Sequence, residues 1–302
     1  MNFTASEAQA FIETFLETKI SSIQILTGGD WSTAFGFQAN DQHLVARFGI
    51  HLDDFAKDRA ASRLASQDLP VPKVLAMGEA FDGYFCITER KFGVMLETLS
   101  ADEMKRIVPA VFRMLDALRI ADTESWCTEI GEPKESWPFS MLEVDQETDR
   151  VCGWHEKLSS HQSLNEVYEK CLGYLRSHVD QCPAEYSLRH RDLLHNNVLV
   201  LDDQITGVIN WGCARVGDYL HDIALLDFYS PWFPAMVEIN WVREAKAHYS
   251  RSGVSVPDFE ERLKCYGVHI GLEGMAYSAF TDDWQEVAAH SHRMSGLMAR
   301  QH

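Results

Sequence analysis

The residues whose types and spacing could do chemistry lie close together in the second half of the chain. Residues 190–197 have the sequence His-Arg-Asp-Leu-Leu-His-Asn-Asn, and Asn210 follows thirteen positions after the last of them. Phosphoryl transfer requires a carboxylate that orients and deprotonates an attacking hydroxyl, and oxygen ligands that hold Mg²⁺ on the phosphates. Asp192 fits the carboxylate, and Asn197 and Asn210 fit the ligands. The sequence therefore predicts a phosphoryl-transfer site.

Asp192 and Asn197 complete the pattern His-Arg-Asp-x-x-x-x-Asn, which is typical of the catalytic loop of protein kinases. In those enzymes the position of Asn210 usually holds a metal-binding Asp. A lone Asp or Asn is more often a turn or capping residue. The complete pattern is flanked by predicted strands at 198–201 and 205–209, and this favours the catalytic interpretation.

The neighbours of the candidate carboxylate are expected to support the loop. We expect His190 to support the loop by hydrogen bonding, and Arg191 either to order it or to face solvent. Asn196 stands next to Asn197, so the metal ligand is uncertain by one position. We expect Asp222, at a helix start, to accept hydrogen bonds from backbone N–H groups of the loop.

The first ninety residues predict a sheet. Alternating apolar residues indicate five short strands, at 23–26, 34–39, 43–48, 73–77 and 84–89. Helical spacing predicts helices at 4–19 and 54–66, the second inserted between the third and fourth strands. The glycine-containing turn at 27–33 could fold over a triphosphate through Ser32 and Thr33, although Gly-Gly-Asp is also an ordinary hairpin turn.

The remainder of the chain is predicted to be mostly helical, which makes the fold class α+β. The predicted helices are 101–121, 164–180, 232–250, 257–280 and 282–299. Residues 122–163 are rich in Trp and irregular, and we place a substrate-side insertion there. We expect a nucleotide-binding lobe at 1–92 and a catalytic and substrate-binding lobe at 93–302.

One basic residue in the predicted sheet could contact phosphate. Arg47 stands where kinases place a Lys that grips the α- and β-phosphates, and it offers a planar fork in place of a point charge. We expect Asp58 on the following helix to hold Arg47; an exposed, weak ion pair is the alternative. Asp53 and Asp54 remain open as partners. The segment joining the lobes would present backbone groups to adenine, and its candidates are Thr88 and Arg90.

Composition restricts the class of protein. With 46% hydrophobic and 24% charged residues the chain is typical of a globular protein, and its net charge of −18 disfavours nucleic acid and anionic membranes as partners. That charge would attract a cationic small molecule, or it could be only a solvated surface. No apolar run approaches the roughly 20 residues of a membrane span, and the N-terminus lacks the features of a signal peptide. Seven scattered cysteines without a Cys-x-x-Cys pair suit a reducing cytoplasm. We expect a monomer.

With these residues in place, the chain resembles the aminoglycoside phosphotransferase family across nearly its whole length. The resemblance is carried by the segments at 55–59, 69–75, 84–90, 190–199, 205–211, 217–218 and 230–232. Arg47 and the sequence Lys57-Asp58-Arg59 point to the branch of the family that acts on hygromycin-type antibiotics.

The resemblance implies a bilobal, protein-kinase-like fold that uses ATP and Mg²⁺ and confers antibiotic resistance. It implies transfer of the γ-phosphoryl group to a hydroxyl of an aminocyclitol, with Asp192 as catalytic base and with Asn197 and position 210 as metal ligands. Aminoglycosides carry several ammonium groups, so acidic side chains would bind them. The candidates are Asp227, Glu238, Glu273, Asp282 and Asp283, with Trp232 and Trp241 as apolar walls.

Asn210 departs from the family, which has Asp there, and a neutral amide oxygen binds a hard cation less well. The enzyme could tolerate Asn, the residue could be an inactivating substitution, or the chain could be a non-catalytic relative that binds nucleotide or antibiotic. Another cationic, hydroxylated metabolite could also replace the antibiotic as acceptor. The choice of hydroxyl and of ATP or GTP stays open.

Overall fold

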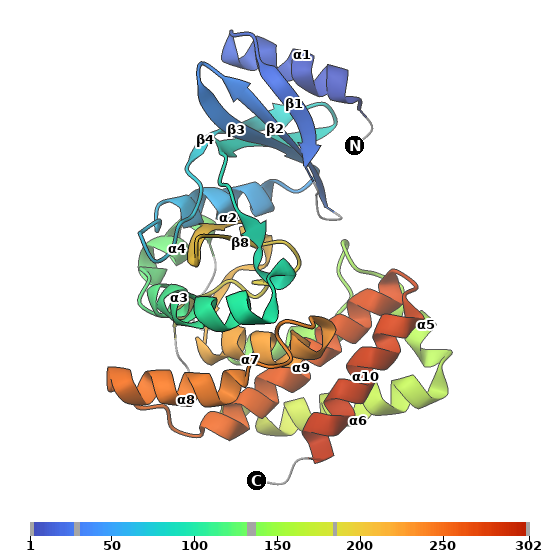
Figure 1. Ribbon diagram of the computed structural model, residues 1–302. Coiled ribbons are helices and arrows are strands. Elements are labelled where there is room, and N and C mark those ends of the chain that lie inside the picture. The colour runs from blue at the N-terminus through green and yellow to red at the C-terminus, as the bar shows by residue number, and fades with distance from the viewer. Residues whose placement is uncertain (1–2, 27–30, 132–136, 184–185, 300–302) are drawn as a thin grey trace.

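A five-stranded antiparallel sheet forms the smaller of two lobes (Figure 1). The structure, a computed structural model, describes residues 3–26, 31–131, 137–183 and 186–299. In space the strands follow the order β1-β2-β3-β5-β4. Their bounds are β1 Ser21–Leu26, β2 Ser32–Ala39, β3 Gln42–Gly49, β4 Val74–Ala80 and β5 Gly83–Glu89. The predicted five-stranded antiparallel sheet is confirmed.

The two faces of this sheet have different neighbours. Helix α1 (Ala5–Leu16) covers one face, and the apolar cluster beneath it includes Phe48. The helix begins with a capping box, in which Thr4 and Glu7 each accept a hydrogen bond from the other's backbone N–H. Because side chains alternate along a strand, Arg47 lies on the opposite face from Phe48. Figure 1 shows that this opposite face is turned toward the larger lobe.

Helix α2 (Leu52–Ser62) connects β3 to β4. The helix predicted at 54–66 is thus present between the third and fourth strands, but it begins and ends earlier than predicted. It lies between the sheet and the larger lobe (Figure 1). Lys57 Nζ donates a hydrogen bond to the backbone oxygen of Gly212 at 2.8 Å, so the helix is joined directly to the larger lobe.

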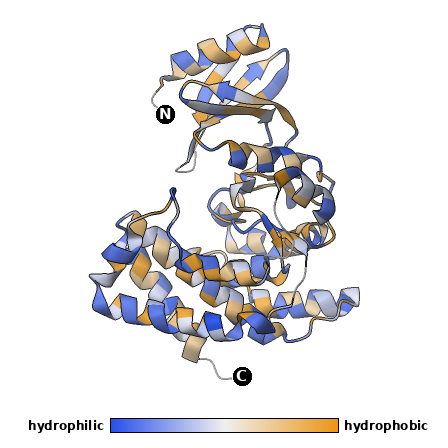
Figure 2. Cartoon of the chain, turned by 180° about the vertical axis from the view of Figure 1, so that it is seen from behind, coloured by the Kyte–Doolittle hydropathy of each residue, from blue (hydrophilic) through white to orange (hydrophobic). Residues whose placement is uncertain are grey.

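The larger lobe is mainly helical, as predicted. Its helices are α3 Ala101–Arg119, α4 Thr123–Ile130, α5 Trp154–Ser159, α6 Gln162–His178, α7 Leu220–Tyr229, α8 Trp241–Ser252, α9 Phe259–Phe280 and α10 Trp284–Ala299. Figure 2 shows hydrophobic and hydrophilic residues mixed along most of these helices, as expected where a helix buries one face. Helix α9 is buried along most of its length and packs against α6, α7 and α10.

Short strands frame residues 190–197, which are called the catalytic segment below. They are β6 Val94–Met95, β7 Ser187–Arg189, β8 Val198–Leu201, β9 Gln204–Val208 and β10 Arg215–Gly217. The predicted hairpin of β8 and β9 is confirmed, and β6 adds a third strand to it. Strands β7 and β10 form a separate antiparallel pair on either side of the hairpin in sequence. Strand β7 ends directly before the catalytic segment and β8 begins directly after it, so paired strands fix both ends of the segment.

Two predictions about the larger lobe are wrong. Residues 122–163 are not wholly irregular, because they contain α4, α5 and a 3₁₀ segment, Phe139–Asp145. The helix predicted at 232–250 begins only at Trp241. Pro234 stands inside the predicted first turns, and the Asn240 side chain accepts the Arg243 N–H at 2.9 Å, which makes Asn240 the N-cap.

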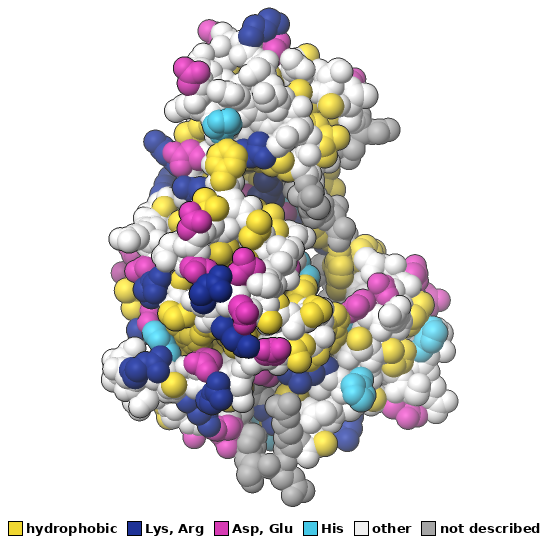
Figure 3. All heavy atoms as spheres, viewed as in Figure 1, with side chains coloured by type: hydrophobic (Ala, Val, Ile, Leu, Met, Phe, Trp, Pro, Cys, Tyr) yellow, Lys and Arg dark blue, Asp and Glu magenta, His cyan; other side chains and the backbone are white. Residues whose placement is uncertain are grey.

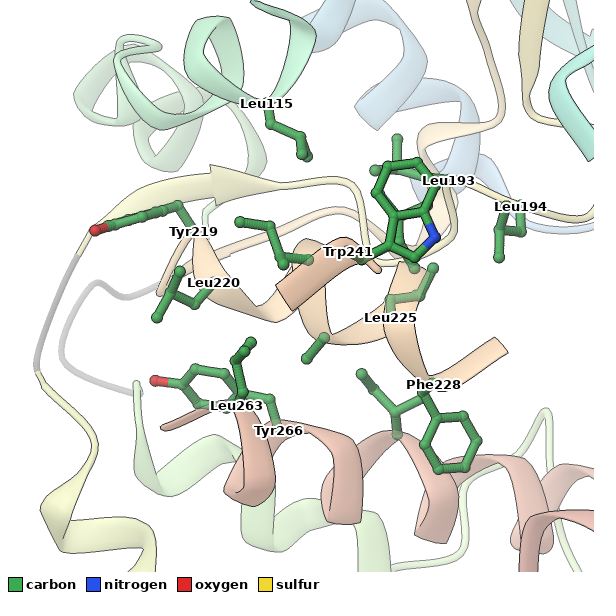
Figure 4. Packing of buried hydrophobic residues seen from close by; sticks show 14 of the residues in the cluster. Leu115, Leu193, Leu194, Tyr219, Leu220, Leu225, Phe228, Trp241, Leu263 and Tyr266 are labelled. Atoms are coloured by element: carbon green, nitrogen blue, oxygen red, sulfur yellow. The ribbon is translucent and has the colours of Figure 1, made fainter. Parts of the chain in front are cut away.

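Trp241 is a core residue and not an apolar wall for a substrate. Its side chain is fully buried in the main hydrophobic cluster, together with Leu193 of the catalytic segment (Figure 4). Across the described ranges, no helix combines the length and apolarity that a membrane span requires.

Candidate active site

The catalytic segment is anchored by a buried carboxylate. The two oxygens of Asp222, near the start of α7, accept the backbone N–H groups of His190 and Arg191, each at 2.8 Å. Burial raises the pKa of Asp222, while these hydrogen bonds and nearby basic groups favour its charged form. The His190 ring contacts the backbone oxygen of Ile209 at 3.0 Å, so it joins the segment to the strand that precedes Asn210. Both supporting roles expected from the sequence are confirmed.

Asn197 holds Asp192 in place. Its Nδ2 donates to the Asp192 backbone oxygen at 2.7 Å, to Asp192 Oδ2 at 2.8 Å and to the Leu194 oxygen at 2.8 Å. Its Oδ1 has no hydrogen-bond donor among the described residues, which leaves this oxygen available to a cation. Asn196 is exposed instead, and its backbone N–H donates to Glu97. The structure therefore favours Asn197 over Asn196 as the ligand position.

The backbone of the site is unusual. Arg191, His195, Asn196 and Asn210 all have positive φ, between 60° and 70°. Non-glycine residues adopt this left-handed conformation infrequently, Asn and His more readily than most. Such conformations persist only where surrounding contacts fix them. The hydrogen bonds of Asp222 and Asn197 fix the segment at 190–197, and those of Arg47 and Asp58 hold Asn210 and Trp211.

Arg47 reaches the site from the sheet. Its Nη1 donates to Asp58 Oδ2 at 2.6 Å and its Nη2 to Asn210 Oδ1 at 3.2 Å. Asp58 Oδ1 accepts the backbone N–H of Trp211 at 3.0 Å, so a single carboxylate joins β3 to the residue after Asn210. Burial raises the pKa of Asp58, and the charge of Arg47 opposes this shift. Arg47, Asp58 and Asn210 thus form one network at the junction of the lobes.

Asp58, rather than Asp53 or Asp54, is the partner of Arg47. Asp53 and Asp54 pair with Arg150, at 2.6 and 2.9 Å, so Asp58 is the partner, as predicted. The pair is not an exposed one, because Asp58 is only 6% exposed. Removing one partner of this pair should therefore cost more than removing one partner of a surface ion pair, because the other charge is left buried.

The other predicted nucleotide contacts lie on the sheet. Ser32 Oγ is 3.4 Å from Arg47 Nε and Nη2, whereas Thr33 is exposed. Residues 27–30 of the glycine-containing turn lie outside the described residues. Thr88 is paired with Val45 across β3 and β5. Arg90 lies against β2, because a Cβ on Gly36 would be 2.7 Å from its Nη1.

An aromatic group stands beside Asp192. His195 Nδ1 is 3.0 Å from Asp192 Oδ1, and its ring centroid is 5.3 Å from that of Tyr229 and 6.1 Å from that of Phe233. Burial lowers the pKa of His195, but the hydrogen bond and charge of Asp192 outweigh it, so this pKa is raised. Trp232 is the next ring, 5.3 Å from Tyr229. The predicted Trp232 is therefore near the site.

Sequence reasoning missed His195, Tyr229 and Glu97. The position of His195, three residues after the candidate base, was a usable signal. Glu97 gave none, because it lies almost a hundred residues earlier and meets the segment only through the fold. One of its oxygens accepts the Asn196 N–H, and its buried Oε2 has no hydrogen-bond donor in the part of the chain that the structure describes.

Most of the predicted substrate-binding acids are already paired with basic side chains. Glu273 pairs with Arg191 and lies 3.6 Å from His269 Nδ1. Burial opposes ionisation of Glu273, but Arg191 and His269 lower its pKa to about 2. The other ion pairs are Asp227 with Arg293, Glu238 with Lys105, and Asp282 with Lys157. Acidic and basic side chains are interspersed on the face of the larger lobe in Figure 3.

Asp227 and Asp283 also have local structural roles. Asp227 lines a cavity between α7, α8, α9 and α10, and no residue of the catalytic segment lines that cavity. Asp283 Oδ1 accepts the backbone N–H of Glu286 at 3.0 Å, in the first turn of α10. A role in substrate binding stays a prediction for these acids.

Comparison with known proteins places the geometry in context. The profile of the phosphotransferase enzyme family matches residues 50–253. Hygromycin-B 4-O-kinase of Escherichia coli is 29% identical over 297 residues, which cover 94% of this chain and 82% of the relative. A thermostable variant of aminoglycoside phosphotransferase APH(4)-Ia, solved with AMP-PNP and hygromycin B, has a TM-score of 0.81 at 25% identity, over 96% of this chain and 97% of that one. Spectinomycin phosphotransferase APH(9)-Ia has a TM-score of 0.66 at 11% identity, over 99% of both chains, and shares the fold.

Three solved variants of APH(4)-Ia carry Ala at positions whose spacing matches that of Asp192, Asn196 and Asn197 in this chain. One replaces an Asp, and the other two replace Asn residues four and five positions after that Asp. In this chain Asn196 and Asn197 stand four and five positions after Asp192.

Proposed function

Because the chain belongs to the phosphotransferase enzyme family, we propose that it transfers the γ-phosphoryl group of ATP to a hydroxyl of a hygromycin-type aminoglycoside. The observation that carries the proposal is the convergence of Asp192, Asn197 and Asn210 with Arg47 at the junction of the lobes. The kinase relative of E. coli and the ternary complex of APH(4)-Ia with hygromycin B support the choice of acceptor.

In this proposal Asp192 acts as the general base. Asn197 fixes one carboxylate oxygen, and the other lies beside His195. The acceptor hydroxyl gives its proton to Asp192 while its oxygen forms a bond to the γ-phosphorus, and the bond from that phosphorus to the ADP oxygen breaks. Arg47, oriented by Asp58, binds phosphate oxygens. Residues 1–92 form the nucleotide-binding lobe and 93–302 the catalytic lobe, with Ser32, Thr33, Thr88 and Arg90 as further nucleotide contacts.

The oxygen donors of the site fit Mg²⁺. Asn197 Oδ1 faces no donor among the described residues, and Asn210 Oδ1 lies on the same network, although it already accepts from Arg47. Mg²⁺ prefers oxygen ligands and is commonly completed by substrate phosphates and water. When bound, it supplies neutralisation of phosphate charge. Two amide oxygens are weaker donors than a carboxylate, so we expect modest metal affinity.

The acceptor is proposed to bind on the side of His195 and Trp232. Glu97 and Glu286 are half-buried carboxylates beside the site, and Glu286 accepts from Trp232 Nε1 at 2.7 Å, so each could meet an ammonium group. The net charge of −18 favours approach of a polycation. We further propose a monomeric, cytoplasmic resistance enzyme, a location that the seven free cysteines suit.

The test is ADP release from ATP in the presence of Mg²⁺, with and without hygromycin B. Wild type is expected to show antibiotic-stimulated release, and Asp192→Ala to lose it by about 10²–10⁴-fold because the general base is gone. Asp68→Ala, which removes an exposed carboxylate paired with Arg113, is the matched control and should keep full activity. Full turnover in Asp192→Ala would overturn the mechanism. Stimulation by another cationic alcohol and none by hygromycin B would overturn the choice of acceptor.

A further inference from the structure

A buried arginine lies beneath the catalytic segment, and no carboxylate pairs with it among the described residues. Arg189, the last residue of β7, is only 1% exposed. Its Nη2 donates to the Val216 backbone oxygen at 3.0 Å, but its Nε and Nη1 have no hydrogen-bond acceptor among the residues described. The guanidinium is closely packed against Trp137 and Gly217. The Trp137 ring is 4.0 Å away, and a Cβ on Gly217 would lie 2.5 Å from Arg189 Nε.

Arg189 lines a small cavity that other basic residues share. Arg191 and Arg215 line it as well, together with Trp137, Ser140, Met141 and His269. The space inside is about 10 Å³, which is room for a single small particle such as a water molecule or a monatomic ion. The cavity is therefore too small for a sugar, a nucleotide or a phosphate ester.

The carboxylates around the cavity are already engaged. Arg191 pairs with Glu273, and Arg215 pairs with Glu143 at 3.0 Å. Asp222 acts on Arg189 from a longer range, but both of its oxygens accept backbone N–H groups of the catalytic segment. Arg189 is thus the basic residue of this group that no carboxylate within the described ranges pairs.

An unpaired buried charge is costly, so a counter-charge is expected. Isolated burial of an ion costs several kcal/mol even after relaxation. Burial and the neighbouring Arg191 lower the pKa of Arg189 to about 9, which still leaves it charged at neutral pH. The Trp137 ring and the more distant charge of Asp222 offset part of this cost, and a bound anion would offset more of it.

A metal ion is the rival occupant, and charge argues against it. Ligand atoms of His221, His269 and Glu273 all lie within 4.8 Å of one another. Burial and the charges of Arg189 and Arg191 lower the pKa of His221, so the imidazole is neutral and could ligate. However, the same two guanidinium groups would repel a divalent cation, and Glu273 is already paired with Arg191.

We propose that the cavity binds a small inorganic anion of halide size, such as chloride, between Arg189, Arg191 and Arg215. The anion would accept hydrogen bonds from Arg189 Nε and Nη1 and would stabilise the pairing of β7 with β10. Because the catalytic segment leaves β7 directly at His190, the anion would act as a structural support for the site. This inference does not depend on the identity of the phosphoryl acceptor.

The test measures the melting temperature while chloride replaces gluconate at constant ionic strength. The melting temperature of wild type should rise with chloride concentration along a saturable curve. The rise should be about 4 °C when chloride is in about a hundredfold excess over its dissociation constant. Arg189→Met should lose the response, whereas the matched control Arg243→Met, at an exposed arginine paired with Glu244, should keep it. Equal melting temperatures of wild type in both salts, or an undiminished response in Arg189→Met, would overturn the proposal. A response to sulfate and none to chloride would also overturn it.

A second measurement guards against failure of Arg189→Met to fold. Crystals of wild type soaked in bromide should show an anomalous peak within hydrogen-bonding distance of Arg189 Nε or Nη1. No peak there, at a bromide concentration that fills other sites, would contradict the proposal. A divalent cation with the three ligands His221, His269 and Glu273 would show instead that the metal interpretation is right.

Discussion

Replacing Asp58 by Asn removes the charge that holds Arg47 while keeping the size of the side chain. One oxygen of Asp58 accepts from Arg47 Nη1 at 2.6 Å and the other from the Trp211 N–H at 3.0 Å. An amide has a single oxygen, so in the variant one of these two donors must face an NH₂ group. The variant therefore breaks a buried ion pair and leaves a donor without an acceptor.

The magnitude follows from the burial of the pair. Removing one partner of a buried ion pair costs about 3–5 kcal/mol. The lower end applies here, because the Arg47 side chain is 17% exposed and keeps contacts with Asn210 and Ser32. With an unfolding entropy of about 2.1 cal/mol/K per residue over 302 residues, a loss of about 3 kcal/mol lowers the melting temperature by about 5 °C.

Thermal unfolding followed by intrinsic fluorescence measures this change. The matched control is Asp68→Asn, whose exposed pair with Arg113 should contribute no more than about 1 kcal/mol. A cycle with Arg47→Met should be non-additive, since the two side chains share one interaction. KM for ATP should rise in Asp58→Asn, because Arg47 loses its orientation. Equal melting temperatures of Asp58→Asn and the control, or additive effects in the cycle, would refute the reasoning.

Two further predictions concern the same site. Asn210→Asp places a carboxylate beside Arg47 and the metal position, so the Mg²⁺ concentration for half-maximal ADP release should fall by about tenfold; an unchanged requirement would show that position 210 is not a ligand. Protonated His195 pairs with Asp192, which raises the pKa of His195 above its ordinary value of 6.5 despite its burial. Wild-type kcat should therefore increase as pH rises through that raised pKa, and His195→Asn should shift the increase to lower pH. The pair of His195 with Asp192 contributes fully to the free energy of unfolding below about pH 6.5, and this contribution is lost as pH rises through the raised pKa of His195. The difference in melting temperature between wild type and His195→Asn should therefore decrease over that pH range. Identical pH profiles of the two proteins would contradict this role.

Local patterns predicted the parts of the site that are close in sequence. Asp192 and Asn197 belong to one short segment, so their spacing was sufficient to bring them together. The choice of Asp58 over Asp53 and Asp54 depended on the direction of helix α2 and on Arg150, which no local pattern contains. The alternating strands of the small lobe were equally clear, because one face of that sheet is buried under α1.

Long-range ion pairs were not predictable from the sequence. Glu273 was expected to bind an ammonium group, yet it pairs with Arg191, which lies 82 positions earlier. Strands β7 and β10 have three residues each, too few to show a period. The buried state of Arg189 had no signal for the same reason, since the pairing of these strands and the stacking of Trp137, both set by the fold, help to enclose it.

The contacts of helix α2 determine where the protein can bend. Although α2 belongs to the smaller lobe by position, Lys57 and Asp58 attach it to Gly212 and Trp211. Its two ends are attached as well, by the pairs of Arg150 with Asp53 and Asp54 and of Arg59 and Arg63 with Glu129. A rotation of the sheet that keeps these contacts leaves α2 behind as part of the larger rigid body. Residues 69–71 stay with the larger lobe as well, because Leu69 and Val71 are buried in its core and the Pro70 backbone oxygen accepts the Val208 N–H at 3.2 Å. The hinges are then residues 50–51, 72–73 and 90–93, and the pair of Arg47 with Asp58 spans the moving boundary. Opening of the molecule would therefore first change the contacts of Arg47, the side chain proposed to bind the phosphates.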